Sequence, residues 1–277
     1  MTLLLALMLQ VGPAPTSEPI PALPPEMEQQ RADRARRAAA AEDAVAPSRL
    51  AQCLARTRRD PGGAVEEAEA WLESARGAQR GDAGQCLGVA QAQLGQGAAS
   101  AETFLAARDA TPEGDLRLRA LRGALAGGAL LGEGDLAGAL ALLDAAREDA
   151  HAAGEGTIAG QIALDRAIAL VALDRADEAA QALAAARAAL PDNAQAWLLS
   201  ATLSRRTGDL AEAQARIERA AELAPRDPAV GLEAGVIAAM AGRDEAARRS
   251  WLSVIEMAPD SPAAARAQAY IDRLEPA

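Results

Sequence analysis

Two cysteines are the only thiols in this 277-residue chain, and each lies in the same tripeptide, Gln-Cys-Leu. Cys53 and Cys86 are the central residues of these tripeptides, 33 positions apart. An even number of cysteines is typical of a disulfide when a protein is exported, whereas two small buried thiols are the alternative. We expect no metal centre, because two cysteines without a neighbouring histidine do not supply four ligands.

The other reactive residue types do not form a recognisable catalytic set. His151 is the only histidine, and we expect it in a solvated connection between helices, within the segment DAHAAGEGT. No spacing places it beside a serine or cysteine nucleophile. The chain has no lysine, which excludes a phosphate-binding P-loop and Schiff-base chemistry. We therefore expect no enzymatic activity and no cofactor.

Charge and composition narrow the classes of partner and of fold. The formal net charge is −11, and no basic cluster is joined to aromatic residues. Neither nucleic acid nor an anionic membrane surface is therefore an expected partner. Alanine and leucine dominate the apolar residues, and there are only three Trp, one Tyr and one Phe. Because Ala and Leu favour helices, the composition predicts an all-α fold.

The N-terminal 25 residues differ from the rest of the chain. Residues 3–11, LLLALMLQV, form an apolar run that is shorter than the roughly 20 residues needed to span a bilayer. The run is typical of a secretory signal peptide, although no arginine precedes it and no small-residue cleavage site follows. An ordinary flexible terminus is the alternative. The prolines that follow, up to residue 25, predict an extended linker.

Residues 26–46 are helix-prone but too polar to bury a wide face, which predicts a helical lead-in. It is either a solvated helix or a short coiled-coil segment. Together these features predict a periplasmic protein with no stable transmembrane segment, and a cytoplasmic location is the alternative.

A 34-residue period marks the C-terminal half of the chain. Prolines, alanines and larger apolar residues recur in register over three units, which indicates an internal repeat. The columns are Pro191, Pro225 and Pro259; Ala179, Ala213 and Ala247; Leu183, Ile217 and Trp251; Ala186, Ala220 and Val254; and the turn residues Asp174, Gly208 and Gly242.

These columns describe a helical hairpin. Ala213, Ile217 and Ala220 stand at i, i+4 and i+7 and share one helix face. The alanines let a neighbouring helix approach, and the isoleucine fills the space between the helices. Gly208 permits a tight turn with positive φ, and Pro225 ends the following helix.

The pattern resembles the tetratricopeptide repeat, a 34-residue helical hairpin with W-x2-L-G-x2-Y in its first helix and A-x3-F, then P, in its second. The best-matched units are residues 160–193, 194–227 and 228–261. Upstream units match at Gly88, Phe104, Pro112, Ala139 and Leu143, with five or six extra residues expected in the loops at EGDLR and HAAGEG.

The resemblance implies a right-handed α-solenoid over residues 47–277, with about six repeats and a C-terminal capping helix at 262–277. Sel1-like and HEAT-type repeats are the alternatives, which the regular spacing disfavours. The two cysteines then occupy equivalent places in the first helices of adjacent repeats. Equivalent residues on neighbouring helices can lie about 8–10 Å apart, whereas a disulfide requires Cα atoms within about 7 Å.

The resemblance also implies an interaction protein that binds a protein or peptide along its first helices. The residues expected to face such a partner are Arg117, Arg119, Arg122, Asp165, Arg166, Trp197, Leu198, Arg205 and Arg206. The Asn and Lys clamp of the family is missing, because the chain has no lysine and only one asparagine, Asn193. The arginines would instead bind an acidic or carboxylate-bearing segment, or form a solvated face.

The function predicted from the sequence is therefore a non-enzymatic scaffold. The alternative is an accessory subunit that presents a polypeptide substrate to an enzyme or cytochrome-maturation complex. Residues 194–206 depart from the consensus at Ser200, Ala201 and Ser204, and this departure makes that helix the expected place of recognition.

Overall fold

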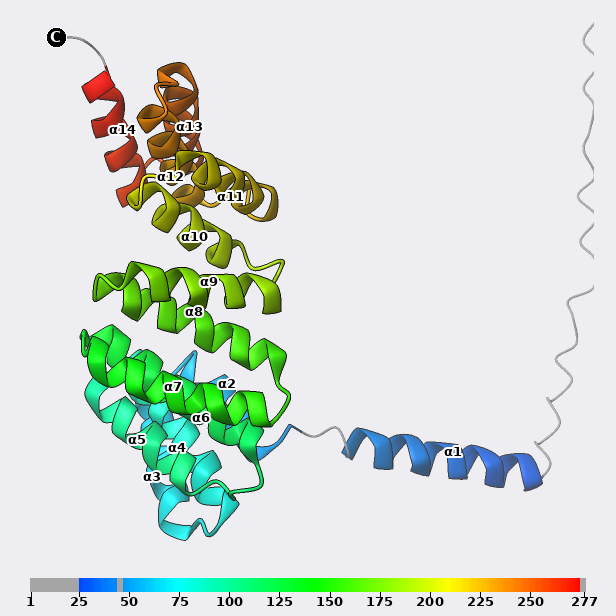
Figure 1. The fold of residues 1–277 in the computed structure, drawn as a ribbon. Helices are drawn as coiled ribbons and strands as arrows, with labels where there is room; N and C mark the ends of the chain where they lie inside the picture. The colour runs from blue at the N-terminus through cyan, green and yellow to red at the C-terminus, as the bar shows by residue number, and fades with distance from the viewer. Residues whose placement is uncertain (1–24, 44–46, 275–277) are drawn as a thin grey trace, which may run out of the picture. The chain divides into compact units, whose positions relative to one another are not determined.

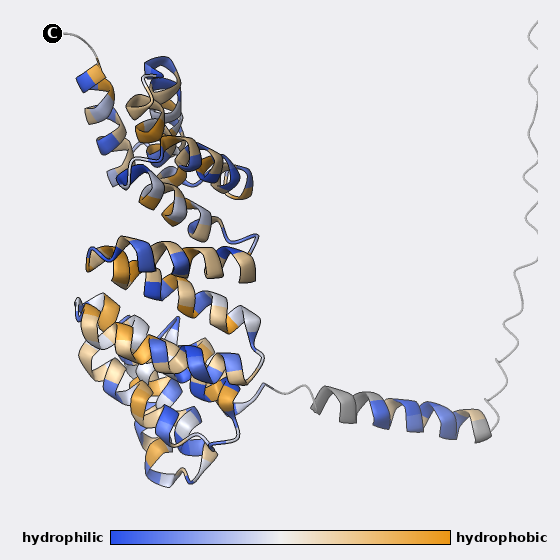
Figure 2. Cartoon of the chain, in the orientation of Figure 1, coloured by the Kyte–Doolittle hydropathy of each residue, from blue (hydrophilic) through white to orange (hydrophobic). Residues whose placement is uncertain are grey.

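The computed structural model describes residues 25–43 and 47–274. The chain divides into two compact units, Met1–Ser48 and Arg49–Ala277. The predicted signal-like run and proline-rich linker lie outside the described residues, apart from Pro25. In the described part of the first unit, helix α1 (Pro25–Asp43) corresponds to the polar lead-in. Its described side chains are exposed and mostly hydrophilic (Figure 2), with Met27 as the one large apolar side chain among them, and Arg36 pairs with Asp33 at 3.0 Å.

The described part of the second unit is a succession of thirteen helices without a strand, in which each helix packs on the next (Figure 1). The predicted all-α solenoid is thus confirmed. The helices are α2 (Arg49–Thr57), α3 (Pro61–Ser74), α4 (Ala78–Gln93), α5 (Gly97–Asp109), α6 (Leu116–Glu133), α7 (Leu136–Ala152), α8 (Gly156–Ala172), α9 (Ala176–Ala189), α10 (Ala194–Arg206), α11 (Leu210–Leu223), α12 (Pro228–Met240), α13 (Asp244–Met257) and α14 (Pro262–Leu274).

The turns within the hairpins follow from particular residues. Gly208 and Gly242 adopt φ values of 90° and 72°, and Asp174, at the equivalent position, adopts a φ of 58°. Short polar side chains tolerate this left-handed conformation better than other non-glycine residues. After Gly208, helix α11 begins with a side-chain cap, in which Asp209 accepts a hydrogen bond of 3.0 Å from the backbone N–H of Glu212.

The predicted repeat columns form the core between the helices. Small residues sit where helices approach closely, and one larger side chain per hairpin fills the remaining space. The buried members are Phe104, Ala139, Leu143, Ala179, Leu183, Ala186, Ala213, Ile217, Ala220, Ala247, Trp251 and Val254. The prolines Pro112, Pro191, Pro225 and Pro259 each follow the end of a second helix, where they prevent its continuation.

The two longer units differ from their predicted form. Most of the extra residues expected in loops instead lengthen the helices, so that α6 has 18 residues and α7 and α8 have 17 each. Alanine and leucine sustain the helical pattern through these residues. The prediction of a long loop was therefore wrong at HAAGEG, whereas at EGDLR a longer connection, residues 110–115, does separate α5 from α6.

The last helix, α14, packs on α12 and α13. Ala264, Ala267 and Ile271 are its buried residues, and the ring of Tyr270 lies 5.2 Å from that of Trp251. This helix therefore covers the apolar face of the last hairpin, as the predicted cap would. Among the described helices, none is long and apolar enough to cross a membrane.

Candidate functional site

Side chains from the alternate helices α4, α6 and α8 line an open hollow of about 530 Å³, which we call the α6 groove. Its apolar wall includes Val89 on α4 and Leu121, Leu125 and Gly128 on α6. Asp165 on α8 also lines the groove. These helices are the first members of their hairpins. Their apolar side chains on this face exceed what contact with the second helices can cover, so an apolar surface remains open to solvent.

Asp165 is the one charged residue among the described residues that line the α6 groove. Its side chain is half-buried, and no hydrogen bond or ion pair joins it to another described residue. Burial raises the pKa of this carboxyl to about 6, because a low-polarity environment disfavours its ionised form. The groove thus combines an apolar wall with one acidic group that the fold does not neutralise.

A second hollow of about 470 Å³ continues along α8 toward α10, and we call it the α8–α10 groove. Ile168 and Val171 of α8 and Leu199 of α10 line it, and Arg206 is the one charged residue in its described lining. Arg206 pairs with the largely exposed Asp174 at 4.0 Å, and because its own side chain is 46% exposed, its guanidinium remains accessible. Of the predicted arginines, it is the one that borders an apolar groove.

Arg122 was predicted to face a partner, and the structure instead places it in the interior. Its side chain is 1% exposed, and its guanidinium donates to Gln85 Oε1 at 3.1 Å, Thr111 Oγ1 at 2.5 Å and Asp82 Oδ1 at 2.5 Å. Residues of α4 and of the connection between α5 and α6 therefore accept hydrogen bonds from all three nitrogens of the guanidinium. The position of Arg122 in the helical pattern of α6 predicted that it faces outward. Gly81, which has no side chain, leaves room for its guanidinium to enter the core.

Two further predicted arginines are bound by acids of neighbouring hairpins. Arg205 on α10 donates from both Nε and Nη2 to Glu233 on α12, at 2.6 Å and 3.3 Å. Arg166 on α8 donates from Nε to Asp144 on α7 at 2.7 Å. A carboxylate from a partner would have to displace these acids, so neither guanidinium is a free anion site.

Arg117 and Arg119 lie at the start of α6. Arg117 is exposed and pairs with Glu155 at 3.1 Å. Arg119 is half-buried, and its Nη1 lies 3.4 Å from the carbonyl oxygen of Thr111, beyond the end of α5. These contacts join consecutive hairpins and explain both side chains without a ligand.

No protein-family model matches the sequence, and no curated protein matches it. Among solved structures, PilF of Pseudomonas aeruginosa aligns with a TM-score of 0.65 and 15% identity over 80% of this chain and 95% of that one. YrrB, described as a TPR protein with an unusual peptide-binding site, aligns with a TM-score of 0.53 and 17% identity over 74% and 99%.

A thermophilic TPR protein of Thermus thermophilus aligns with a TM-score of 0.53 and 19% identity, over 68% of this chain and 97% of that one. The fold is that of the tetratricopeptide repeat. At these identities the likeness establishes the fold alone. The chemistry of a partner has to be inferred from the side chains of this chain.

Helix α10, where the tetratricopeptide pattern is least regular, places its predicted contact residues in packing roles. Trp197 donates from Nε1 to the carbonyl oxygen of Pro191 at 2.8 Å, and the guanidinium of Arg187 lies 5.2 Å above its ring. Leu198 is half-buried and packs against the cluster that contains Ile217. Trp197 therefore secures the junction between α9 and α10.

The two serines that replace tetratricopeptide consensus residues on α10 receive arginines from the flanking second helices. Arg187 of α9 donates to Ser200 Oγ, and Arg216 of α11 donates to Ser204 Oγ at 2.5 Å. Both serines are buried, so the long arginine stems take the space that Leu and Tyr would fill. The departure from the consensus thus has an internal packing explanation.

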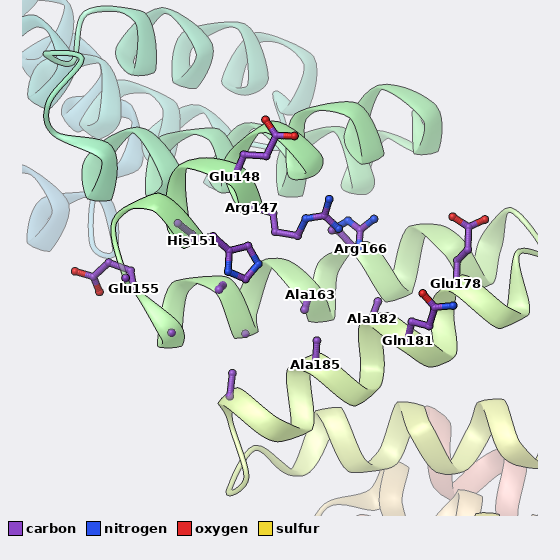
Figure 3. A pocket seen from close by; sticks show the side chains of 16 residues that line it. Arg147, Glu148, His151, Glu155, Ala163, Arg166, Glu178, Gln181, Ala182 and Ala185 are labelled. Atoms are coloured by element: carbon purple, nitrogen blue, oxygen red, sulfur yellow. The ribbon is translucent and has the colours of Figure 1, made fainter.

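A third groove, of about 980 Å³, lies between α7 and α9 over α8, and Figure 3 shows it from close by. Arg147 and His151 of α7 lie on one side of it, and Ala182 and Ala185 of α9 lie on the other. His151 was expected in a loop, but α7 extends through Ala152. No serine, threonine or cysteine is among the described residues that line this groove, so its histidine faces no nucleophile there.

The cysteines lie face to face between α2 and α4. The structure pairs Cys53 with Cys86 as a disulfide, with Cα atoms 6.0 Å apart, and both residues are fully buried. Helix α2 packs directly on α4, and the two Cα atoms are closer than the spacing expected for equivalent helices. The geometry therefore permits the predicted bridge. Within the described part of the chain, no cluster of three or more His, Cys, Asp or Glu side chains could hold a metal ion.

Proposed function

We propose that this protein is a non-enzymatic scaffold that binds a polypeptide partner along its first helices. The observation that carries the proposal is the pair of apolar grooves that meet on α8, one toward α6 and one toward α10. Apolar hollows that remain open on a folded protein are typical of binding sites. The structural neighbours support an interaction role, and YrrB is itself described as having a peptide-binding site.

The proposed binding surface can be tested by replacing an apolar residue in each groove with an acidic one. Leu125→Glu alters the α6 groove and Leu199→Glu alters the α8–α10 groove. Leu252→Glu makes the same change at an exposed leucine on α13, outside both grooves. We expect the full-length protein and the Leu252 variant to recover one stoichiometric partner from cells, and the groove variants to lose it. A partner retained by both groove variants would refute the proposal.

We also propose export to the periplasm. The apolar run at residues 3–11 and the closely placed cysteines support this location. Cell fractionation with N-terminal sequencing tests it, since an intact Met1 in the cytosol would overturn it. The identity of the recovered partner separates a scaffold from the alternative, a subunit that presents substrates to an envelope enzyme or cytochrome-maturation complex.

A further inference from the structure

The α6 groove contains an acidic group that the rest of the molecule leaves without a counter-ion. In the described residues, the half-buried carboxylates other than Asp165 are matched to an arginine or to a backbone N–H. Glu67, Asp82, Asp144, Asp149, Glu155 and Glu233 each pair with an arginine, while Asp115 and Asp227 cap helices. Asp165 is the exception.

This exception has an energetic consequence. A half-buried carboxylate in an apolar wall loses hydration and gains nothing from the fold in return. Its position on α8, between the apolar walls of the two grooves, makes it accessible from the groove. A ligand that brings a cation to Asp165 would recover the lost interaction, whereas an anionic ligand would add repulsion.

We propose that the α6 groove binds a partner segment in which a lysine or arginine side chain contacts Asp165 and the flanking apolar side chains contact Leu121 and Leu125. This inference rests on the proposed function and specifies the chemistry of the partner. It reverses the charge that the predicted arginine face would favour, because Arg122 is buried and Arg166 and Arg205 are bound by acids of neighbouring hairpins. The exposed Arg117 and Arg206 each have an acidic partner as well, Glu155 and Asp174.

The surroundings of Asp165 favour a polypeptide over a small free cation. Ile168 and Val171 follow Asp165 on the same helix and line the adjoining α8–α10 groove. The apolar surface therefore continues beyond the acid along the axis of α8. A segment with a cation between apolar residues uses both parts of this surface, whereas an isolated cation uses only one.

The chain's own lead-in helix is a second source of cations. Helix α1 carries Arg31, Arg34, Arg36 and Arg37, but between these arginines its described apolar side chains are only small alanines, and its one large described apolar side chain, Met27, precedes them. Such a helix offers a large apolar side chain on one side of its arginines only, whereas the wall of Leu121 and Leu125 favours apolar side chains that flank the cation. We therefore assign the groove to a separate partner and make the lead-in an arm of the test.

The experiment uses the full-length protein and three sets of 12-residue peptides. All sets carry Leu, Ile, Val or Met around a central residue, which is Arg or Lys in the first set, Gln in the second and Glu in the third. Affinities are measured for the wild type, for Asp165→Asn and for Asp174→Asn. Asp174 is an exposed aspartate in a turn after α8, so its variant makes the same charge change outside the α6 groove.

We expect the wild type and Asp174→Asn to bind the cationic set about 10-fold or more tightly than the Gln set, since a charge-assisted contact in an apolar site is strong. The Asp165→Asn variant should lose this preference but still bind the Gln set with the affinity of the wild type. Circular dichroism confirms that both variants fold. Equal binding of the cationic and Gln sets, or a preference that survives in Asp165→Asn, would overturn the inference but leave the proposed function intact.

Two other outcomes have distinct meanings. If none of the three sets binds, the result counts against both the inference and the proposed function. If the cationic preference appears only after Arg31, Arg34, Arg36 and Arg37 are replaced by Gln, the lead-in occupies the groove, and the assignment to a separate partner is overturned.

Discussion

The indole ring of Trp251 on α13 lies in the space that a Cβ on Gly235 of α12 would occupy. The same relationship joins Gly88 to Phe104, and Gly127 to Leu143. In each of these hairpins a glycine of the first helix allows the largest core side chain of the second helix to reach the helix backbone. The close contact sets how tightly the two helices pack.

Replacing Gly235 by Ala should therefore destabilise the protein by about 1–2 kcal/mol. A Cβ would overlap the nearly buried Trp251 ring, and overpacking typically costs about 1–3 kcal/mol, partly offset by alanine's helix propensity. Gly132→Ala on α6 is the matched control, because a Cβ there meets nothing within 4 Å. We expect it to stabilise by roughly 0.5–1 kcal/mol. Urea denaturation of both variants measures the difference, and equal shifts would contradict the packing argument.

Arg122 provides a second prediction about the interior. Arg122→Ala should destabilise by about 3 kcal/mol, because it leaves Gln85, Thr111 and Asp82 without their shared donor. Arg117→Ala removes the same side chain from an exposed site on the same helix, where surface changes usually stay within about 0.5 kcal/mol. Thermal unfolding compares the two variants. A similar small loss for both would mean that Arg122 is solvated and available to a partner.

The cysteine pair predicts a dependence of stability on redox conditions. Closing a loop between Cys53 and Cys86 should contribute about 3–4 kcal/mol to the free energy of unfolding. We expect a reductant to lower the melting temperature of the wild type but not of a Cys53→Ala/Cys86→Ala variant. Mass mapping of the protein isolated under non-reducing conditions should recover the cross-linked peptides, and two free thiols would refute the bridge.

The sequence predicted the hairpins because each depends on local residues. Gly208, Pro225 and the alanine columns act within one or two helices, so their spacing is visible in the chain. The arginine contacts depend on distant residues, as where Arg122 meets Gln85, and helical phase alone assigned that arginine to the surface.

One feature of the sequence could have predicted where the grooves lie. Asp165, Leu199 and Glu233 share one repeat position, 34 residues apart, and this position lies along the groove side of the first helices. Glu233 is neutralised by Arg205, whereas Asp165 has no such partner among the described residues. Whether an acid at this position is paired depends on the neighbouring hairpin, so only the folded arrangement distinguishes the two.

The raised pKa of Asp165 predicts how stability varies with pH. Because burial raises the pKa from 3.8 to about 6 in the folded state, the folded protein holds this proton more tightly than the unfolded chain does. The stabilisation from protonated Asp165 is therefore complete below about pH 4 and is lost as pH rises through about 6. The rise in the pKa of Asp165 corresponds to a change of no more than about 3 kcal/mol in the free energy of unfolding.

Asp165→Asn removes this dependence. Relative to the wild type, we expect the variant to gain stability steadily between about pH 4 and pH 7, with little difference at the acidic end. The free energy of unfolding in urea, measured at each pH for both proteins, gives the difference directly and cancels the titration of every other group that the two chains share. Asp174→Asn controls for the charge change at an exposed site. A difference between Asp165→Asn and wild type that stays constant across this pH range would mean that the carboxylate is hydrated in solution, and the α6 groove would then lack the uncompensated acid on which a cationic partner depends.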